Sequence, residues 1–363
     1  MSKFYSPSTI NRKNATYNLI FGERSNGKTY ALLKQSVLDY VKTGGQMAYV
    51  RRWKEDITGR RASRLFSALC ENGEIATLTN NEFTGVHYWA GKFYLCNYDE
   101  KGKPVFADQD VICFAFSLSD GEHDKSTSFP NVTLIIFDEF LTNKLYLNDE
   151  FVHFMNTIST IVRKRVDVKI YMLGNTVNKY CPYFAEMGLE HVQKMKQGTI
   201  DVYRYGDSSL IVAVEYCKSI DNGNSTEANK YFAFNNPKLS MITGGAWELN
   251  IYPHLPYKYK PKDILLTYFI DFSDNIYQCE VINIGDVYFT YIHIKTTPIQ
   301  NPDSDLIYSL DYNPKPNYNR SIFKPVSNVQ KKIAWFFAND KVFYQDNNVG
   351  DAIANYLKIC KGA

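Results

Sequence analysis

The chain has 363 residues, of which 45% are hydrophobic and 22% are charged, and its formal net charge is +3. This length and composition predict a globular protein of about two domains and exclude an intrinsically disordered chain. So small a charge does not by itself indicate a nucleic-acid partner, because any basic surface would have to be local. No apolar run approaches the ~18–20 residues that cross a bilayer, so we expect no membrane partner.

Residues 1–12 are polar and lack the apolar core of a secretory signal. The seven cysteines are scattered without a C-x-x-C pair. An odd number with such spacing argues against a disulfide framework and against a zinc site. We therefore expect the protein to work in a reducing cytoplasm.

The first predicted strand covers residues 17–22 and leads into the motif G-x-x-x-x-G-K-[ST], which is followed by a helical pattern over residues 28–42. A strand, a glycine loop and a helix in this order are typical of a phosphate-binding P-loop, and the alternative is a chance match on a glycine turn. Lys28 is expected to reach the terminal phosphates and Thr29 to bind Mg²⁺. The residues expected to bind the nucleotide are Gly22, Arg24, Ser25, Asn26, Gly27, Lys28 and Thr29.

A second strand is predicted over residues 46–51, and it ends in the basic sequence Arg51-Arg52-Trp53-Lys54. Residues 58–71 are predicted to form a basic helix. The pattern between residues 75 and 117 is one of short strands and turns, which favours a β insertion on an α/β frame. Its three strands are expected at residues 83–87, 92–97 and 111–117.

A continuous apolar strand follows at residues 132–137 and ends in Asp138 and Glu139. This is the Walker B form, which places Asp138 beside Mg²⁺ at the carboxyl edge of a parallel sheet. Glu139 would then orient or polarise the attacking water. The alternative is a solvated turn. An acidic pair of this kind favours the ATPase class whose sheet carries extra strands over kinases and GTPases.

A helix is predicted at residues 148–165 and a strand at residues 168–173. Asn175 follows that strand and is either a γ-phosphate sensor or part of a plain turn. Arg163 lies at the end of the helix. Either it is simply a cation that the helix dipole favours there, or it serves as an arginine finger in a neighbouring subunit's site. Arg24 either contacts phosphate in its own chain or is an ordinary solvated side chain.

Composition divides the chain into an ATPase domain at residues 1–217, a linker or hinge subdomain at 218–250 and a second domain at 251–363. Three strands joined by tight turns are predicted at residues 264–272, 276–284 and 287–294. Residues 297–320 are expected to be a loop. Two helices are expected near the end of the chain, at 326–338 and 348–360.

Taken together, these motifs resemble those of viral DNA-packaging ATPases, in the short form found in phi29-like tailed phages. The resemblance covers roughly residues 15–190. It is carried by G-x-R-x-x-G-K-T, Tyr49-Val50-Arg51-Arg52, Phe129-Pro130-Asn131-Val132, Ile136-Phe137-Asp138-Glu139-Phe140, Arg163-Lys164-Arg165, Asn175 and Pro182-Tyr183-Phe184.

The resemblance implies more than the spacing of motifs does. Such proteins form a ring, with five subunits expected, on the portal vertex of a prohead in the host cytoplasm. They translocate double-stranded DNA through the central pore and hydrolyse ATP at subunit interfaces, and some use a packaging RNA. By match, Arg163 and Lys125 would act on the neighbouring site and Arg24 would be the P-loop arginine. Lys54 and Arg52 would contact DNA.

The resemblance also implies a C-terminal RNase H-like α+β domain. A two-metal nuclease needs several carboxylates that converge on one site. The candidates beyond residue 260 are Asp271, Asp274, Glu280, Asp286 and Asp351. Two of these, Asp274 and Asp286, lie in expected turns, so we expect a nuclease-like fold without nuclease activity that binds nucleic acid or the portal. Lys258, Lys260 and Lys262 are phosphate-binding candidates or a solvated linker.

Two rival functions stay open at this point. One is another P-loop motor or phage-assembly ATPase, for example a helicase, although the chain lacks a second motor half. The other is a nucleotide-gated scaffold that binds ATP without turnover. The intact set of Lys28, Thr29, Asp138 and Glu139 argues against a degenerate site.

Overall fold

The computed structural model describes residues 4–120, 127–142, 146–147, 149–176, 181–218, 251–273 and 275–362. These residues form two compact units, the first made of most of residues 4–218 and the second of residues 146–147 and 251–362. The predicted linker at 218–250 lies almost entirely outside the described residues, so the proposed division into three parts stays a prediction. In the described part of the chain, no helix is both long and apolar enough to span a bilayer.

The first unit is built on a 10-stranded sheet in the order β3-β4-β6-β2-β7-β8-β1-β10-β9, with β5 paired to β4. The six central strands are parallel, and the outer pairs are antiparallel. In this spatial order the strands are β3 (Gly85–Trp89), β4 (Lys92–Tyr98), β6 (Val111–Ser117), β2 (Gln46–Arg51), β7 (Val132–Asp138), β8 (Lys169–Asn175), β1 (Tyr17–Gly22), β10 (Ile211–Tyr216) and β9 (Thr199–Arg204), with β5 at Pro104–Val105.

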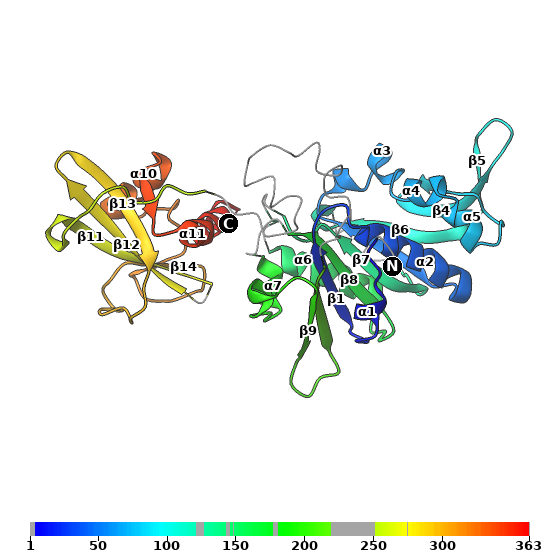
Figure 1. Ribbon diagram of the computed structural model, residues 1–363, viewed down its shortest axis with the longest axis horizontal. Helices are drawn as coiled ribbons and strands as arrows, with labels where there is room; N and C mark the ends of the chain where they lie inside the picture. The colour runs from blue at the N-terminus through cyan, green and yellow to red at the C-terminus, as the bar shows by residue number, and fades with distance from the viewer. Residues whose placement is uncertain are drawn as a thin grey trace. The chain divides into compact units, whose positions relative to one another are not determined.

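Helices cover both faces of this sheet, as Figure 1 shows for α2 (Lys28–Thr43) and α6 (Glu150–Val162). On the α2 face, Leu32 and Val37 pack against Met47 and Ile136. On the α6 face, the Phe137 ring lies 5.0 Å from that of Phe154. Successive strand residues thus alternate between two buried layers, which explains why β1 and β7 read as continuous apolar runs. The predicted α/β fold is confirmed.

The remaining helices of the first unit are short. They are α1 (Ser8–Asn11), η1 (Lys54–Asp56), α3 (Gly59–Ala62), α4 (Ser67–Glu71), α5 (Glu74–Leu78), η2 (Asp108–Asp110), η3 (Leu118–Asp120), α7 (Pro182–Glu186) and η4 (Val192–Lys194). The predicted single helix at residues 58–71 is wrong. Gly59 and Gly73 both adopt positive φ, and the buried Ile57, Ala62 and Phe66 follow the irregular path of the chain rather than one helical face.

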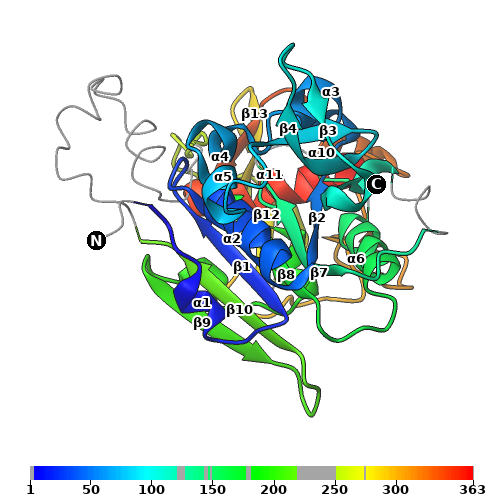
Figure 2. The ribbon, with the colours of Figure 1, turned by 90° about the vertical axis from the view of Figure 1, so that its right-hand side faces the viewer.

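The pairing of β10 with β1 was not predicted from the sequence, which indicated only mixed structure in that region. Figure 2 shows the green strands β9 and β10 beside the blue strand β1. Because β10 is parallel to β1, its carboxyl end reaches the same edge of the sheet as the P-loop. Residues at the end of β10 therefore contact the P-loop.

The second unit is an α+β domain with a six-stranded sheet in the order β15-β14-β11-β12-β13-β16. The strands β11 (Ile264–Phe272), β12 (Asn275–Ile284) and β13 (Val287–Ile294) agree with the prediction to within a residue. Its helices are η6 (Pro261–Asp263), α10 (Asn328–Ala338) and α11 (Asn347–Gly362). The expected loop at 297–320 contains two short strands, β14 (Ile307–Ser309) and β15 (Tyr318–Asn319), and β16 (Val342–Tyr344) completes the sheet.

Two of the candidate nuclease carboxylates make structural contacts. Glu280 accepts hydrogen bonds from Tyr259 and Gln278, each at 2.6 Å. Asp351 accepts one from Tyr252 at 2.9 Å. Within the described residues, no group of three or more acidic, histidine or cysteine side chains is placed to hold a metal ion. Asp274 lies outside the described residues, and the nuclease-like character of the domain stays a prediction.

We predict that the second unit loses stability as the pH rises above neutrality. The Nε2 atom of His293 lies 3.6 Å from Glu280, and the interaction with this carboxylate raises the pKa of His293. A histidine whose folded pKa is raised stabilises fully below its unfolded pKa of about 6.5, and the contribution is lost as the pH rises through the folded value. Amide hydrogen exchange of β12 and β13 should therefore be slower at pH 6 than at pH 8 after correction for the intrinsic rate.

His293→Gln is the control for this prediction, because it keeps a polar side chain without the titration. The burial of Glu280 is outweighed by its interaction with His293 and by the hydrogen bonds that it accepts from Tyr259 and Gln278, so its pKa is lowered and the pair weakens again at acid pH. If the pH dependence of exchange were the same in wild type and His293→Gln, the pair would have no such role.

Candidate nucleotide-binding site

The P-loop lies where the sequence predicts it, between β1 and α2. Gly27 adopts φ 87° as the N-cap of α2, and Ser25 adopts φ 61°. A side-chain carbon at Gly22 would lie 2.9 Å from Cys217 Cβ, so this position requires glycine. The loop thus closes tightly and leads directly into the N-terminus of α2, the end of a helix at which phosphates bind.

Lys28 is buried and already directed across the loop. Its Nζ donates to the carbonyl of Glu23 at 2.7 Å, to Asn26 Oδ1 at 3.1 Å and to Asn175 Oδ1 at 3.4 Å. Burial lowers the pKa of Lys28, while Asp138 and Glu23 act in the opposite direction. Phosphate oxygens can replace these carbonyl and amide acceptors, so the ammonium is placed to bind an anion.

Thr29 and Asp138 form the part of the site that fits Mg²⁺. The Thr29 hydroxyl donates to Asp138 Oδ2 at 3.0 Å, and the Tyr49 hydroxyl donates to the same oxygen at 2.7 Å. A hydroxyl and a carboxylate at this separation suit an ion that takes most of its ligands from phosphates and water. Burial, together with the charge of Asp138, raises the pKa of Tyr49 well above its usual value, so the phenol stays protonated and acts as a donor.

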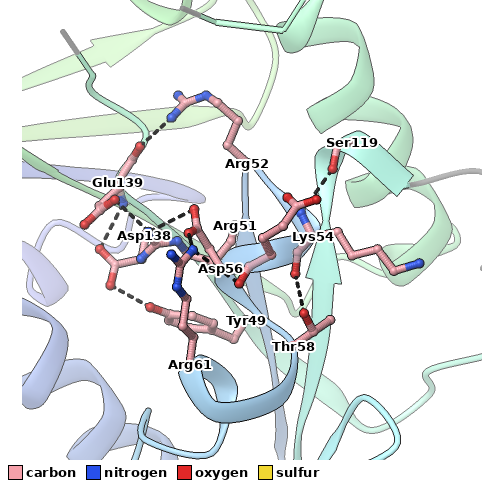
Figure 3. A network of polar contacts seen from close by, with 11 residues as sticks. Tyr49, Arg51, Arg52, Lys54, Asp56, Thr58, Arg61, Ser119, Asp138 and Glu139 are labelled. Carbon is pink, nitrogen blue, oxygen red and sulfur yellow. Dashed lines mark hydrogen bonds and ion pairs between the residues drawn. The ribbon is translucent and has the colours of Figure 1, made fainter. Parts of the chain in front are cut away.

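Glu139 directly follows this carboxylate and has an unusual backbone conformation. Its φ is 61°, and its backbone N–H donates to Asp138 Oδ1 at 2.9 Å. The side chain is more than half exposed, and Arg51 holds it through a 2.6 Å contact between NH2 and Oε2. A positive φ in a residue with a side chain costs free energy and is typical of functional sites. Figure 3 shows Glu139 and Arg51 directed toward each other.

Arg51 is a site residue that sequence reasoning missed. It also contacts Asp56 at 3.5 Å, and Asp56 in turn pairs with Arg61 at 2.9 Å. Burial alone would lower the pKa of Arg51, but Tyr49 and the carboxylates of Glu139 and Asp138 raise it overall. The signal was present in the sequence, because Tyr49 and Arg51 are two residues apart and share one face of a strand. What was missing was the knowledge that β2 pairs with β7.

Arg52 corrects one of the sequence-based predictions, since it does not lie where DNA could contact it. Its side chain is buried and forms a bidentate ion pair with Glu150, with contacts of 2.6 Å and 2.9 Å. It also donates to the carbonyls of Glu139 and Phe140 at 3.1 Å and 2.9 Å. Tyr183 completes the cluster by donating to Glu150 at 2.9 Å. Arg52 directly follows Arg51, the last residue of β2, so the alternation of the strand directs it to the α6 face of the sheet.

Lys54 remains a candidate for DNA contact. Its side chain is exposed and pairs with Asp120 at 2.6 Å, and this hydrogen bond raises the pKa of the ammonium. The backbone N–H of Lys54 donates to Ser119 Oγ at 3.1 Å, which connects this turn to η3. Arg60, Arg61 and Arg64 follow on an exposed stretch.

The other predicted site residues take different positions. Asn175 lies at the end of β8 beside Lys28, and its role as a sensor of the terminal phosphate stays a prediction. Arg163 caps α6 with φ 43° and donates to the carbonyl of Thr127 at 2.7 Å. It precedes β8, so it lies at the opposite edge of the sheet from the P-loop. Arg24 is exposed at the loop, and Lys125 lies outside the described residues.

Comparison with known proteins gives a consistent result. A family model described as podovirus DNA encapsidation protein (Gp16) matches residues 1–227. The DNA packaging proteins of Bacillus phages phi29 and PZA are each 28% identical over 186 residues, which is 50% of this chain and 49% of theirs. That of Bacillus phage B103 is 30% identical over 175 residues, 47% of this chain and 48% of the relative. The chain thus matches about half the length of these curated relatives.

Two solved structures resemble the whole chain in fold. The Phi-28 gp11 DNA packaging motor aligns over 99% of both chains with a TM-score of 0.57 and 18% identity. The bacteriophage phi29 viral genome packaging motor assembly aligns over 98% of this chain and 100% of its own, with a TM-score of 0.57 and 20% identity. At this level of identity the likeness concerns the fold alone.

Proposed function

Because the chain belongs to the family of podovirus DNA encapsidation proteins (Gp16), we propose that it is an ATPase that drives double-stranded viral DNA into a prohead. The observation that carries this proposal is the convergence of Lys28, Thr29, Asp138 and Asn175, with contacts of 3.0 Å and 3.4 Å between residues from two strands and a helix. This is the residue set that nucleoside triphosphate hydrolysis requires.

The proposed chemistry assigns one task to each side chain. Lys28 and the N-terminal backbone of α2 bind the phosphates, and Thr29 and Asp138 hold Mg²⁺, which neutralises charge that develops on the phosphates. Glu139 orients and polarises the attacking water, and Arg51 fixes its carboxylate. Asn175 contacts the terminal phosphate through the amide that now faces Lys28.

Arg51 joins this chemistry to the segment proposed to contact DNA. The same guanidinium nitrogen lies 2.6 Å from Glu139 and 3.5 Å from Asp56, and the other carboxylate oxygen of Asp56 pairs with Arg61. Lys54 and the exposed arginines would contact DNA phosphates rather than base edges. Binding should therefore be independent of sequence and weakened by salt. Lys54→Ala should reduce the salt dependence of duplex binding, measured by titration at several salt concentrations, whereas an unchanged slope would remove Lys54 from the interface.

The ring assembly is the next part of the proposal. We infer a homo-oligomeric ring, five subunits by resemblance, in which Arg163 and Lys125 complete the neighbour's site. The position of Arg163 supports this role, because it lies at the edge of the sheet opposite its own P-loop. The partners proposed are a prohead portal and a packaging RNA, with the C-terminal unit as the nucleic-acid- or portal-binding part. The proposed location is the host cytoplasm, transiently at the portal vertex.

We predict that Arg163→Gln and Glu139→Gln subunits, each inactive in rings of their own kind, recover ATP turnover when they are mixed. If Arg163 acts in the neighbouring site, an Arg163→Gln subunit keeps its own Glu139 and can be completed by the arginine of a Glu139→Gln neighbour, so some sites in the mixture are whole. The measurement is the steady-state ATPase rate of mixtures at constant total protein with DNA present. Lys164→Gln is the matched control, because Lys164 is the next residue and also has a positive φ. Mixtures of Arg163→Gln and Glu139→Gln that stay as inactive as either variant alone would contradict a role in the neighbouring site.

A further inference from the structure

The N-terminal segment Phe4–Asn11 crosses the P-loop and contacts it through the backbone. The Tyr5 N–H donates to the carbonyl of Asn26 at 2.9 Å. Asn26 is the loop residue whose side-chain oxygen accepts from the backbone N–H of Lys28 at 3.3 Å and from its ammonium at 3.1 Å. The segment is therefore hydrogen-bonded directly to Asn26, the residue that orients the phosphate-binding Lys28.

Both ends of this segment are anchored in the sheet that supports the loop. At one end the Tyr5 hydroxyl donates to Glu215 Oε2 on β10 at 2.7 Å. At the other end Asn11 donates to Gln35 of α2 at 3.0 Å and accepts from Tyr171 of β8 at 2.6 Å. Ile10, between the anchors, is completely buried in the core that also contains α2. The segment is thus fastened on both sides of the P-loop.

The residue before α2, Gly27, packs closely against the same segment. A side-chain carbon at Gly27 would lie 3.4 Å from Phe4 Cβ, and Gly27 has φ 87°. Directly after β10, the Cys217 N–H donates to the carbonyl of Phe21 at 2.8 Å, next to the first residue of the loop. The loop is therefore held between the N-terminal segment and the β10 end, and Tyr5 and Glu215 join these two sides.

We propose that residues 4–11 are a positioning strap that sets the nucleotide affinity of the P-loop, with the Tyr5–Glu215 pair as its fastening. A phosphate cradle works only when its N–H groups converge, and holding them in advance removes part of the cost of ordering them on binding. Loosening the strap weakens the binding of ATP equally in the ground state and in the transition state. KM for ATP should therefore rise while kcat stays the same.

The inference rests on the proposed ATPase function and is tested on the full chain with Mg²⁺ and ATP. Tyr5→Phe keeps the ring and the backbone bond to Asn26 but loses the bond to Glu215. KM should rise about 2- to 10-fold, as expected for loss of one hydrogen bond, with kcat unchanged. Glu215→Leu should match this effect, the double variant should add little to it, and Glu215→Gln, which retains an acceptor, should stay close to wild type.

Tyr205→Phe is the matched control. It also removes one tyrosine hydroxyl bond in the same unit, the 2.6 Å bond to the carbonyl of Met187. It should leave KM unchanged. If Tyr5→Phe and Tyr205→Phe have the same KM, or if Tyr5→Phe lowers kcat and thermal stability without changing KM, the strap is not a positioning element. A wild-type chain that neither binds a fluorescent ATP analogue nor hydrolyses ATP would instead overturn the proposed function.

Discussion

Replacing Glu139 with glutamine is expected to reduce kcat for ATP hydrolysis by about 100- to 10,000-fold and to leave ATP binding intact. Glutamine cannot take a proton from water, but its amide oxygen can still accept the hydrogen bond that Arg51 gives to Glu139. The geometry next to Asp138 is therefore preserved while the chemistry is lost. Steady-state hydrolysis and equilibrium binding of ATP, measured on the same preparation, separate the two effects.

Glu55→Gln is the control for this experiment. Glu55 is exposed in the short helix η1, a few residues after Arg51, and its substitution makes the same change in charge. It should leave kcat unchanged. Full DNA-stimulated hydrolysis by Glu139→Gln would show that the base has been assigned to the wrong residue.

Replacing Arg52 with methionine is expected to destabilise the first unit by about 3–5 kcal/mol, because it leaves the buried Glu150 carboxylate without its partner. For a unit of this size the melting temperature should fall by roughly 6–20 °C. Methionine approximates the length of the arginine stem, so the loss of packing is small. Thermal unfolding followed by circular dichroism gives the melting temperature.

The double variant Arg52→Met/Glu150→Met is the decisive comparison. Removing both charges should be less harmful than removing one, because no buried charge remains unpaired. Lys54→Met is the surface control and should melt close to wild type. A normal melting temperature in Arg52→Met, combined with weaker DNA binding, would contradict the buried role and restore Arg52 as a DNA contact.

The sequence alone predicts the elements of the candidate nucleotide site because they are local. The P-loop is eight consecutive residues, and its strand and helix flank it directly. Asp138 and Asn175 each follow a predicted strand, and parallel strands bring their carboxyl ends to one edge, so their convergence could be predicted without knowing the strand order. The confirmed α/β fold and family resemblance both rest on these short-range patterns.

What could not be predicted depended on contacts between distant segments. Arg51 and Arg52 are adjacent and chemically alike, yet one holds Glu139 and the other is buried against Glu150. Only the pairing of β2 with β7 and the direction of each side chain separate them. The Tyr5–Glu215 contact spans 210 positions and depends on β10 joining the sheet beside β1. No local pattern carries that information.

The most direct test of the central claim is the ATPase rate of the purified full chain. It is measured alone, with double-stranded DNA, and with DNA and purified proheads, each in the presence of Mg²⁺. A DNA-packaging motor predicts hydrolysis that rises with DNA, rises further with proheads, and is abolished in Glu139→Gln under all three conditions. A basal rate that neither DNA nor proheads change would contradict the packaging function.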